Sequence, residues 1–411
     1  MSNALLVVFR TLRQLWLRVA AFCVLGLVAA LAAVVFAPWV PADFALTIGT
    51  GAVDQVLSIL ASSMLAVATF SLAAFVTTYT AIAAVATPRA AKLMVSDGRS
   101  QGAIATFVGA FVYGVVGVFA LQTGYYGAQG RVILFFVTIA VLVLVVVALV
   151  QWVGQLSRLG QADEAIVRVA GATRTALKAR LRWSGGAESD EASGAVAVAA
   201  TEVGYVRNID VEGLETLARE LGVVVFADSL PGAEVGGARP LFRFKGRARL
   251  SADDLARLRS RFLIGDRRSF DQDPVYGFIV LGQIAAKALS PGVNDAGTAI
   301  DVVSTGVGLL AEWIKTADEH AATNLANLRF PSLSADDLLD SLAALYGAGD
   351  ASVGVRLQSA MLTLVALGDP AMTRAAHRHA RLALDRAMQT LELDDDKQRV
   401  RRAAEPADSA A

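Results

Sequence analysis

Residues 132–153 read VILFFVTIAVLVLVVVALVQWV, a run of 22 residues without a single charge. As an α-helix this run would extend ~33 Å, which is enough to cross the hydrocarbon core of a bilayer. Three further apolar stretches cover about residues 15–36, 53–86 and 103–121. The sequence therefore predicts four transmembrane helices within residues 1–154.

Charged residues are distributed very unevenly along the 411-residue chain. Residues 1–150 contain ten of them, whereas residues 151–411 contain the other 64, and the two signs balance to a net charge of zero. The first third has the composition of a membrane domain and the rest that of an ordinary globular domain, which excludes a wholly soluble protein. Because there is no excess of basic charge, we expect no nucleic-acid partner.

Cysteine and histidine are scarce. The single cysteine, Cys23, cannot form an internal disulfide, and no Cys/His cluster in the sequence suggests a metal site, so we expect no cofactor and no metal. The three histidines, His320, His377 and His379, are expected at the surface. The sequence lacks the motifs of phosphate-binding loops, dinucleotide-binding folds, serine hydrolases and zinc proteases, so an enzyme is not expected.

Basic residues mark one side of the predicted spans. The N-terminal arm, the loop between the second and third spans and the segment after the fourth span together contain twelve Lys and Arg residues, whereas the two opposite loops contain only Arg131. Loops rich in Lys and Arg stay in the cytoplasm. Both termini are therefore predicted to be cytoplasmic, and the chain after residue 154 is predicted to be cytosolic.

The second span carries many hydroxyl groups. Ser58, Ser62, Thr69 and Thr80 fall near one helical face. This face would either pack against the small residues of the third span or line a hydrated path through the membrane. No charged residue lies well inside a span, which argues against a proton relay or a charge-coupled pump.

Two features are predicted at the cytosolic face of the membrane. Arg89 and Asp97, in the loop after the second span, would form an ion pair or bind a lipid phosphate. Residues 155–195 are predicted to be a basic juxtamembrane helix, which continues from the fourth span and lies on anionic lipid, followed by a flexible linker rich in Gly, Ala and Ser.

The remaining chain divides into three parts. Residues 196–265 alternate strand and turn signals and predict a small β-rich module. Residues 266–393 predict a helical domain, and residues 394–411 predict a charged, flexible tail. The predicted fold class is thus a membrane α-helical domain with a cytosolic α+β domain, in which the β-rich module precedes the helices.

Polar residues flank the first helix predicted in the helical domain, over 275–289. The candidate ligand-binding or structural residues are Arg267, Arg268, Asp271, Gln272, Asp273, Ser290, Asn294 and Asp295. In an antiparallel pair with the next helix, the first five would lie at one end and the last three at the other. They would either form caps and salt bridges, with Asp273 and Asn294 as caps, or bind an ion, a ligand or a partner.

Two stretches resemble a bacterial family of predicted membrane proteins, domain of unknown function 2254. Residues 61–114 are similar to its second span, its Ser/Thr-Pro-Arg turn (here Thr87-Pro88-Arg89) and its third span. Residues 265–299 are similar to its Ala-Leu-Ser-Pro-Gly-x-Asn-Asp-Pro pattern and the residues before it, with Ala296 in place of the usual proline. The resemblance implies a protein of the bacterial inner membrane with a cytosolic domain, and it implies no activity.

Two hypotheses of function remain open. The first is an oligomeric channel-like or transport protein in the lipid bilayer, whose cytosolic domain serves assembly or gating. It requires a homo-oligomer, because four spans per chain rarely enclose a pore. The second is a non-transporting, membrane-anchored module whose cytosolic domain binds a partner protein or a small ligand.

Overall fold

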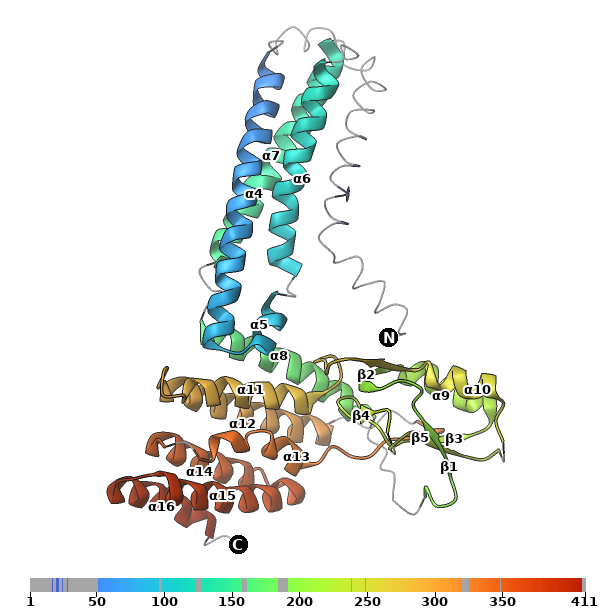
Figure 1. The fold of residues 1–411 in the computed structure, drawn as a ribbon, viewed down its shortest axis with the longest axis vertical. Coiled ribbons are helices and arrows are strands. Elements are labelled where there is room, and N and C mark those ends of the chain that lie inside the picture. Colours follow the sequence, from blue (N-terminus) through green and yellow to red (C-terminus); the bar gives the residue numbers. More distant parts are fainter. Residues whose placement is uncertain are drawn as a thin grey trace. The chain divides into compact units, whose positions relative to one another are not determined.

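The chain forms two compact units in the computed structural model, and each is described by itself (Figure 1). The apolar unit covers Val7–Ile82 and Lys92–Gln161. The polar unit covers Met1–Leu6, Ala83–Ala91 and Ala162–Ala411. The structure describes residues 17, 20, 21, 24, 28, 51–95, 98–122, 128–156, 161–183, 191–237, 239–247, 249–319, 325–347 and 349–408.

Among its described residues, the apolar unit contains three helices that are long and apolar enough to cross a membrane. These are α4 (Ala52–Val85), α6 (Gly98–Gln122) and α7 (Ala128–Leu156). They correspond to the second, third and fourth predicted spans. The first predicted span, 15–36, lies outside the described residues except for five positions that are all helical.

Small residues bring α4 and α6 into close contact. A Cβ atom at Gly114 of α6 would come within 3.0 Å of the Ala61 Cβ atom and 3.1 Å of the Leu57 carbonyl oxygen on α4. The Tyr113 hydroxyl forms a buried hydrogen bond of 3.0 Å with Thr138 of α7. The third span therefore packs closely on the second, as predicted. The α4 residues in this contact are Leu57 and Ala61, however, and not the residues of the predicted hydroxyl face.

A turn separates α4 from the short helix α5 (Pro88–Val95). The Thr87 hydroxyl accepts a hydrogen bond of 3.2 Å from the Ala90 amide and so caps the first turn of α5. Pro88 lacks a backbone N–H group, but at the first helical position this group would have no acceptor within the helix. Arg89 and Lys92 are exposed, whereas Ala90, Ala91 and Met94 are buried.

The polar unit contains two small sheets. One has the strand order β1 (Val196–Ala199), β5 (Pro240–Lys245), β3 (Val224–Ala227) and β7 (Leu328–Arg329), and the other has β4 (Glu234–Val235), β2 (Gly204–Ile209) and β6 (Phe262–Gly265). All neighbours are antiparallel except β3 and β7. The predicted module 196–265 contains six of these strands, while β7 joins from outside it.

Helices α9 (Val211–Leu221) and α10 (Ala252–Arg259) belong to the same module. Asp210 accepts a hydrogen bond from the Gly213 amide at the start of α9, and Ser251 and Asp254 form a capping box at the start of α10. Their apolar faces join a core with the sheets that includes Leu214, Leu258 and stacked Phe242 and Phe262. Strong local start signals thus place both helices against the sheets.

The rest of the polar unit is helical (Figure 1). It consists of α8 (Ala162–Leu181), α11 (Pro274–Ala288), α12 (Ala296–Glu319), α13 (Ala335–Asp340), η2 (Ala343–Leu345), α14 (Ala351–Val365), α15 (Pro370–Thr390) and α16 (Asp394–Asp408). Helix α8 packs on α11 and α12, and α14 packs on α12, α15 and α16.

Helix α8 differs from the predicted lipid-bound continuation of the fourth span. Helix α7 ends at Leu156 and α8 begins at Ala162 as a separate helix. Its buried face, which includes Val169, Thr173 and Leu177, packs into the helical layer. The apolar face of α8, which was predicted to lie on lipid, instead packs against α11 and α12.

The prediction of a flexible tail from residue 394 is wrong. Residues 394–408 form α16, whose Val400 and Ala404 are buried one turn apart. Val400 lies against Gly354 of α14, where a Cβ atom would approach its Cγ2 atom to 2.9 Å. Two apolar side chains on one face therefore hold a strongly charged segment in place.

The prediction of surface histidines is also wrong for His379. Only 1% of this residue is exposed. Its Nδ1 atom lies 3.0 Å from the Tyr346 hydroxyl, and its Nε2 atom lies 3.3 Å from the Asp336 carboxylate. His320 lies outside the described residues.

Candidate functional site

The first turn of α11 is built on an ion pair whose carboxylate is buried. Asp273 is the N-cap and accepts a hydrogen bond of 3.0 Å from the Tyr276 amide, and Pro274 follows at the first helical position. Arg268 donates to both oxygens of the same carboxylate, at 2.7 and 2.9 Å. Its guanidinium group also lies over the Tyr276 ring, at 5.3 Å. The side chain of Asp273 is only 2% exposed and that of Arg268 is 24% exposed, so the carboxylate is withdrawn from water while its partner is partly accessible.

The neighbouring segments hold this pair in place. Gln272 accepts a hydrogen bond of 2.8 Å from the Ile209 amide and donates one of 3.2 Å to the Ile209 carbonyl, which attaches the segment to β2. Gly232 has φ +94°, and a Cβ atom there would lie 2.3 Å from Asp273 Oδ2. Only glycine fits this position. The structure thus brings the predicted Arg268, Gln272 and Asp273 together, and these side chains bond to one another and to the neighbouring backbone.

The other predicted residues lie elsewhere. Ser290, Asn294 and Asp295 stand at the opposite end of α11, as the hairpin argument required. Asp295 accepts bonds from the Thr298 amide and hydroxyl, at 3.0 and 2.6 Å, so Asp295 rather than Asn294 caps α12. These bonds lower the pKa of Asp295. Asn294 instead makes the turn with φ +51°.

Arg267 and Asp271 are exposed beside the ion pair. Arg89, at the start of α5, lies close enough to Tyr276 for its positive charge to oppose the rise in the Tyr276 pKa that burial causes. Asp97, its predicted partner, lies outside the described residues. Arg89 therefore approaches the first turn of α11.

A cavity of about 280 Å³ adjoins the first turn of α11. It brings together four segments of the polar unit that are far apart in the sequence. The lining residues are Arg180, Leu230, Pro231, Arg268, Gln272, Asp273, Pro274, Val275, Ser332, Leu333, Asp337 and Asp340. Arg268, Gln272 and Asp273 were predicted as candidates, whereas Arg180, Asp337 and Asp340 were not.

Arg180 is the most unusual residue of this cavity. It is only 6% exposed, and its Cζ atom lies 5.1 Å from the centre of the Trp183 ring. Its Nη2 atom donates to the Pro331 carbonyl at 2.9 Å, but its buried Nη1 atom has no hydrogen-bond partner in the part of the chain that the structure describes. Burial lowers the pKa of Arg180 to about 10, and the Asp273 charge opposes this shift.

Two carboxylates line the same cavity from α13. Asp340 is 68% exposed at its side chain, and Asp337 is also exposed. Leu230, Val275 and Leu333 contribute apolar surface to the same lining. The cavity thus combines a buried cation, exposed acids and an apolar wall.

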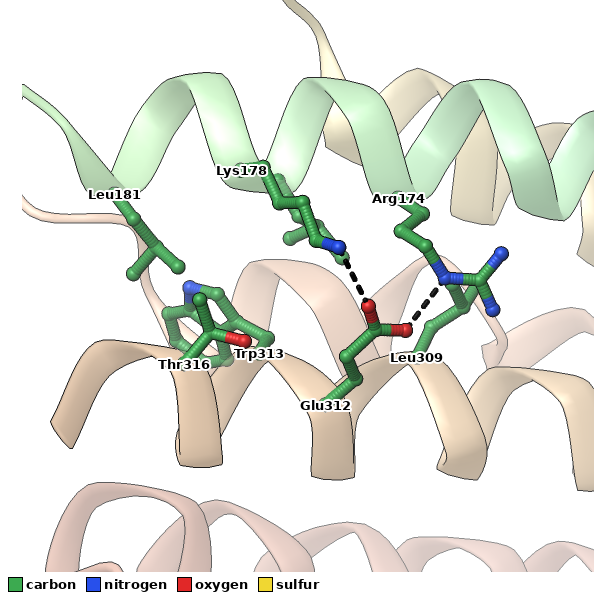
Figure 2. Close-up of a pocket in the computed structure, with 8 residues that line it drawn as sticks. Arg174, Lys178, Leu181, Leu309, Glu312, Trp313 and Thr316 are labelled. Atoms are coloured by element: carbon green, nitrogen blue, oxygen red, sulfur yellow. Dashed lines mark hydrogen bonds and ion pairs between the residues drawn. The ribbon is translucent and has the colours of Figure 1, made fainter. Parts of the chain in front are cut away.

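Two other hollows carry less chemistry. Figure 2 shows Arg174 and Lys178 of α8 directed at the Glu312 carboxylate of α12, with the Lys178 ion pair at 3.0 Å. That hollow measures only about 10 Å³, so it is a packed joint between two helices. An open groove of about 330 Å³ beside α9 contains Asp210, Glu220, Arg257 and Arg261, which pair with one another.

Helix α11 reaches α4 at its other end. Lys287, in its last turn, donates a hydrogen bond of 3.1 Å to the carbonyl oxygen of Ala83, in the last turn of α4. Both residues belong to the polar unit. A lysine at this position satisfies a carbonyl that the helix end leaves without a donor.

The hydroxyl face of α4 is exposed in the chain. Ser58, Ser62, Thr69 and Thr80 are all exposed. The hydroxyls of Ser62, Thr69 and Thr80 donate to carbonyl oxygens three or four residues earlier in their own helix. The face therefore offers polar oxygens without needing a partner helix, and it is not the face on which α6 packs.

The three apolar helices agree with the comparison with known families. The family described as a predicted membrane protein, DUF2254, matches residues 13–363, which is most of the chain. The chain belongs to this DUF2254 family. The match includes α4, α6, α7, the sheets and the cavity, and the family carries no assigned activity. No curated protein and no solved structure matches the chain.

This DUF2254 protein is a membrane protein whose described residues include three candidate membrane helices and a helical region with small sheets. Among the described residues, no group of three or more His, Cys, Asp or Glu side chains could hold a metal ion.

Proposed function

We propose that this protein is a membrane-anchored binding module. In this proposal the polar unit binds a small ligand in the cavity beside the first turn of α11, called the Arg180 cavity below, and α11 transmits binding to α4. The observation that carries the proposal is the position of α11. Its first turn lines the cavity, and its last turn donates to the Ala83 carbonyl of α4. One helix therefore joins the candidate ligand site to Ala83, at the end of α4 that belongs to the polar unit.

The role of the cavity is binding rather than catalysis. The Asp273 carboxylate, which could otherwise act as a general base, accepts hydrogen bonds from Nε and Nη2 of Arg268 and from the Tyr276 amide. Each of its oxygens thus has a partner, whereas the buried Arg180 Nη1 atom has none among the described residues. A ligand would thus meet a fixed ion pair and one cation that still has donor capacity.

The proposal includes a topology. The protein would cross the bacterial inner membrane four times, with both termini and the polar unit in the cytoplasm. The excess of Lys and Arg on one side of the predicted spans supports this topology, and membership of the family supports a location in a membrane. The lipid bilayer is then its first partner.

Enrichment of a cellular metabolite tests the binding function. The full-length protein in lipid nanodiscs is incubated with a filtered metabolite extract, washed and denatured, and the released compounds are identified by mass spectrometry. The control is Val275→Trp, which places an indole in the cavity. We expect a compound that the wild-type protein retains and the variant does not. Equal recovery from both proteins would contradict the proposal.

A second candidate function is an oligomeric channel. The support is the exposed hydroxyl face of α4, whose oxygens could line a hydrated path if copies of the chain assemble around it. Recording in planar bilayers tests it, with Thr69→Leu against the matched change Phe70→Leu. This function predicts a conductance that the first change alters and the second does not. Absence of conductance in purified oligomers would exclude it.

A further inference from the structure

We propose that the ligand of the Arg180 cavity is a small zwitterion of amino-acid type, whose anionic group binds Arg180 and whose cationic group faces Asp337 and Asp340. This inference rests on the proposed binding function and adds the chemical class of the ligand. It follows from the charges, the unused donor and the size of the cavity.

The anionic end of the ligand follows from the charge balance around Asp273. This single carboxylate faces two arginines, because Arg268 binds it directly and Arg180 interacts with it electrostatically. Arg268 occupies both carboxylate oxygens. One buried positive charge therefore remains without a full partner. A buried charge is costly unless it is paired, so this wall of the cavity favours a carboxylate.

The hydrogen-bond inventory of Arg180 points the same way. Its Nη2 atom donates to the Pro331 carbonyl, whereas its Nη1 atom is buried without a partner in the described part of the chain. A guanidinium group matches a carboxylate with two parallel donors. The stacking on Trp183 holds its plane in a fixed orientation. Arg180 is thus preorganised for an anionic group.

The cationic end of the ligand follows from the acids of α13. Asp337 and Asp340 line the cavity from α13. Among the described residues, Asp337 forms no ion pair, and the ion-pair contact of Asp340 is with His379, at 3.8 Å. These acids would repel a second anionic group. An ammonium group of the ligand would instead complement them.

The size and the walls limit the rest of the ligand. A cavity of about 280 Å³ falls just below the range of roughly 300–1,000 Å³ for drug-sized ligands, so the ligand must be small. Leu230, Pro231, Val275 and Leu333 add apolar surface to the lining of the same cavity. A zwitterion with a short apolar side chain fits this distribution better than a nucleotide or a sugar phosphate.

A thermal-shift panel tests the inference on the full-length protein in nanodiscs. The probes are the neutral L-amino acids and glycine betaine, compared with succinate as a diacid and putrescine as a diamine. We expect at least one zwitterion to raise the melting temperature, with no shift from succinate or putrescine. A preference for either of these would overturn the inference, as would a panel without any shift.

Two variants locate the binding. Arg180→Gln should abolish the shift, and Asp337→Asn should weaken apparent affinity about two- to fivefold, since the lost charge is exposed. Asp337→Asn keeps the test valid if Arg180→Gln fails to fold. The matched control is Asp385→Asn, which removes an exposed acid on α15. Zwitterion binding that is equal in Asp337→Asn and the wild-type protein would overturn the inference. The metabolite enrichment separates this inference from the binding function. If the wild-type protein retains a compound that is not a zwitterion and Val275→Trp does not, the inference is overturned while the binding function stands.

Discussion

Arg268 and Asp273 form a two-point ion pair, with Nε to Oδ2 at 2.7 Å and Nη2 to Oδ1 at 2.9 Å, and this pair fixes the start of α11. The same carboxylate caps the helix through the Tyr276 amide. Burial raises the pKa of Asp273 and the Arg268 charge opposes that rise. The pair thus connects helix initiation, the β-rich module and the wall of the cavity.

Removing one partner of this pair should be strongly destabilising. We expect Arg268→Ala to lower the free energy of unfolding by about 3–5 kcal/mol, because the Asp273 carboxylate would be left buried without its cation. Chemical denaturation in nanodiscs, followed by circular dichroism, measures this loss. Arg267→Ala, at the exposed neighbour, is the control and should change stability by less than about 0.5 kcal/mol. Equal effects of the two changes would refute this role of the pair.

The contact between α8 and α11 depends on Gly277. A Cβ atom there would lie 2.0 Å from the Thr173 hydroxyl oxygen. Gly277→Val should therefore separate the two helices and lower the melting temperature. Gly171→Ala, on α8 with open space around it, should be neutral or slightly stabilising. A normal melting temperature of Gly277→Val would show that the helices do not pack this closely.

Helix α16 should depend on its two buried apolar residues. Val400→Asp would place a charge against Gly354 of α14, and we expect α16 to detach. Limited proteolysis reports this change as rapid cleavage between α15 and α16. The exposed Arg401→Asp introduces the same acid one position later and should leave the cleavage rate unchanged. Rapid cleavage of the wild-type protein at this position would contradict the packed helix.

His379 should make the stability of the polar unit depend on pH. Burial lowers the pKa of this imidazole below its ordinary value of 6.5, while the Asp340 charge opposes and the Arg378 charge adds to this shift. The unfolded chain therefore binds a proton more readily than the folded chain, and stability falls as the pH drops below about 6.5. The melting temperature at pH 7.5, 6.5 and 5.5 measures the effect, which His379→Gln should reduce and His377→Gln should not. Identical slopes in the two variants would exclude His379 as the source.

Local signals predicted the elements around the site well. Asp273-Pro274 and Ser290-Pro291-Gly292 bound a predicted helix at 275–289, and α11 covers Pro274–Ala288. A capping aspartate, a first-turn proline and a terminal Pro-Gly turn act within a few residues of one another. Such signals need no knowledge of the tertiary structure.

The cavity could not be predicted because its chemistry is not local. Arg180, Pro231, Asp273 and Asp337 come from four separate segments, and only the packing of α8 on α11 places Arg180 beside Asp273. In the sequence, Arg180 counts as one of several cytoplasmic basic residues. Its burial depends on the apolar face of α8, which is equally typical of a helix on a membrane surface.

The tail and His379 show a second limit of sequence patterns. Residues 394–408 are so rich in charge that their average hides Val400 and Ala404, although this i, i+4 spacing is typical of a buried helical face. His379 belongs to a face of α15 with Ala375, Ala376 and Ala383, and its burial depends on Tyr346 from another segment. In both helices, one buried face determines how the helix packs, although the average composition of the helix is polar.

The central claim is that α11 carries the state of the cavity to α4, and hydrogen–deuterium exchange tests it most directly. The full-length wild-type protein, Val275→Trp, Lys287→Met and the double variant are compared in nanodiscs by mass spectrometry of the peptide that covers residues 83–91. We predict that the indole at position 275 changes exchange in this peptide at least about threefold, and that Lys287→Met removes this response. Exchange at 83–91 that is the same in Val275→Trp and the wild-type protein would contradict the claim.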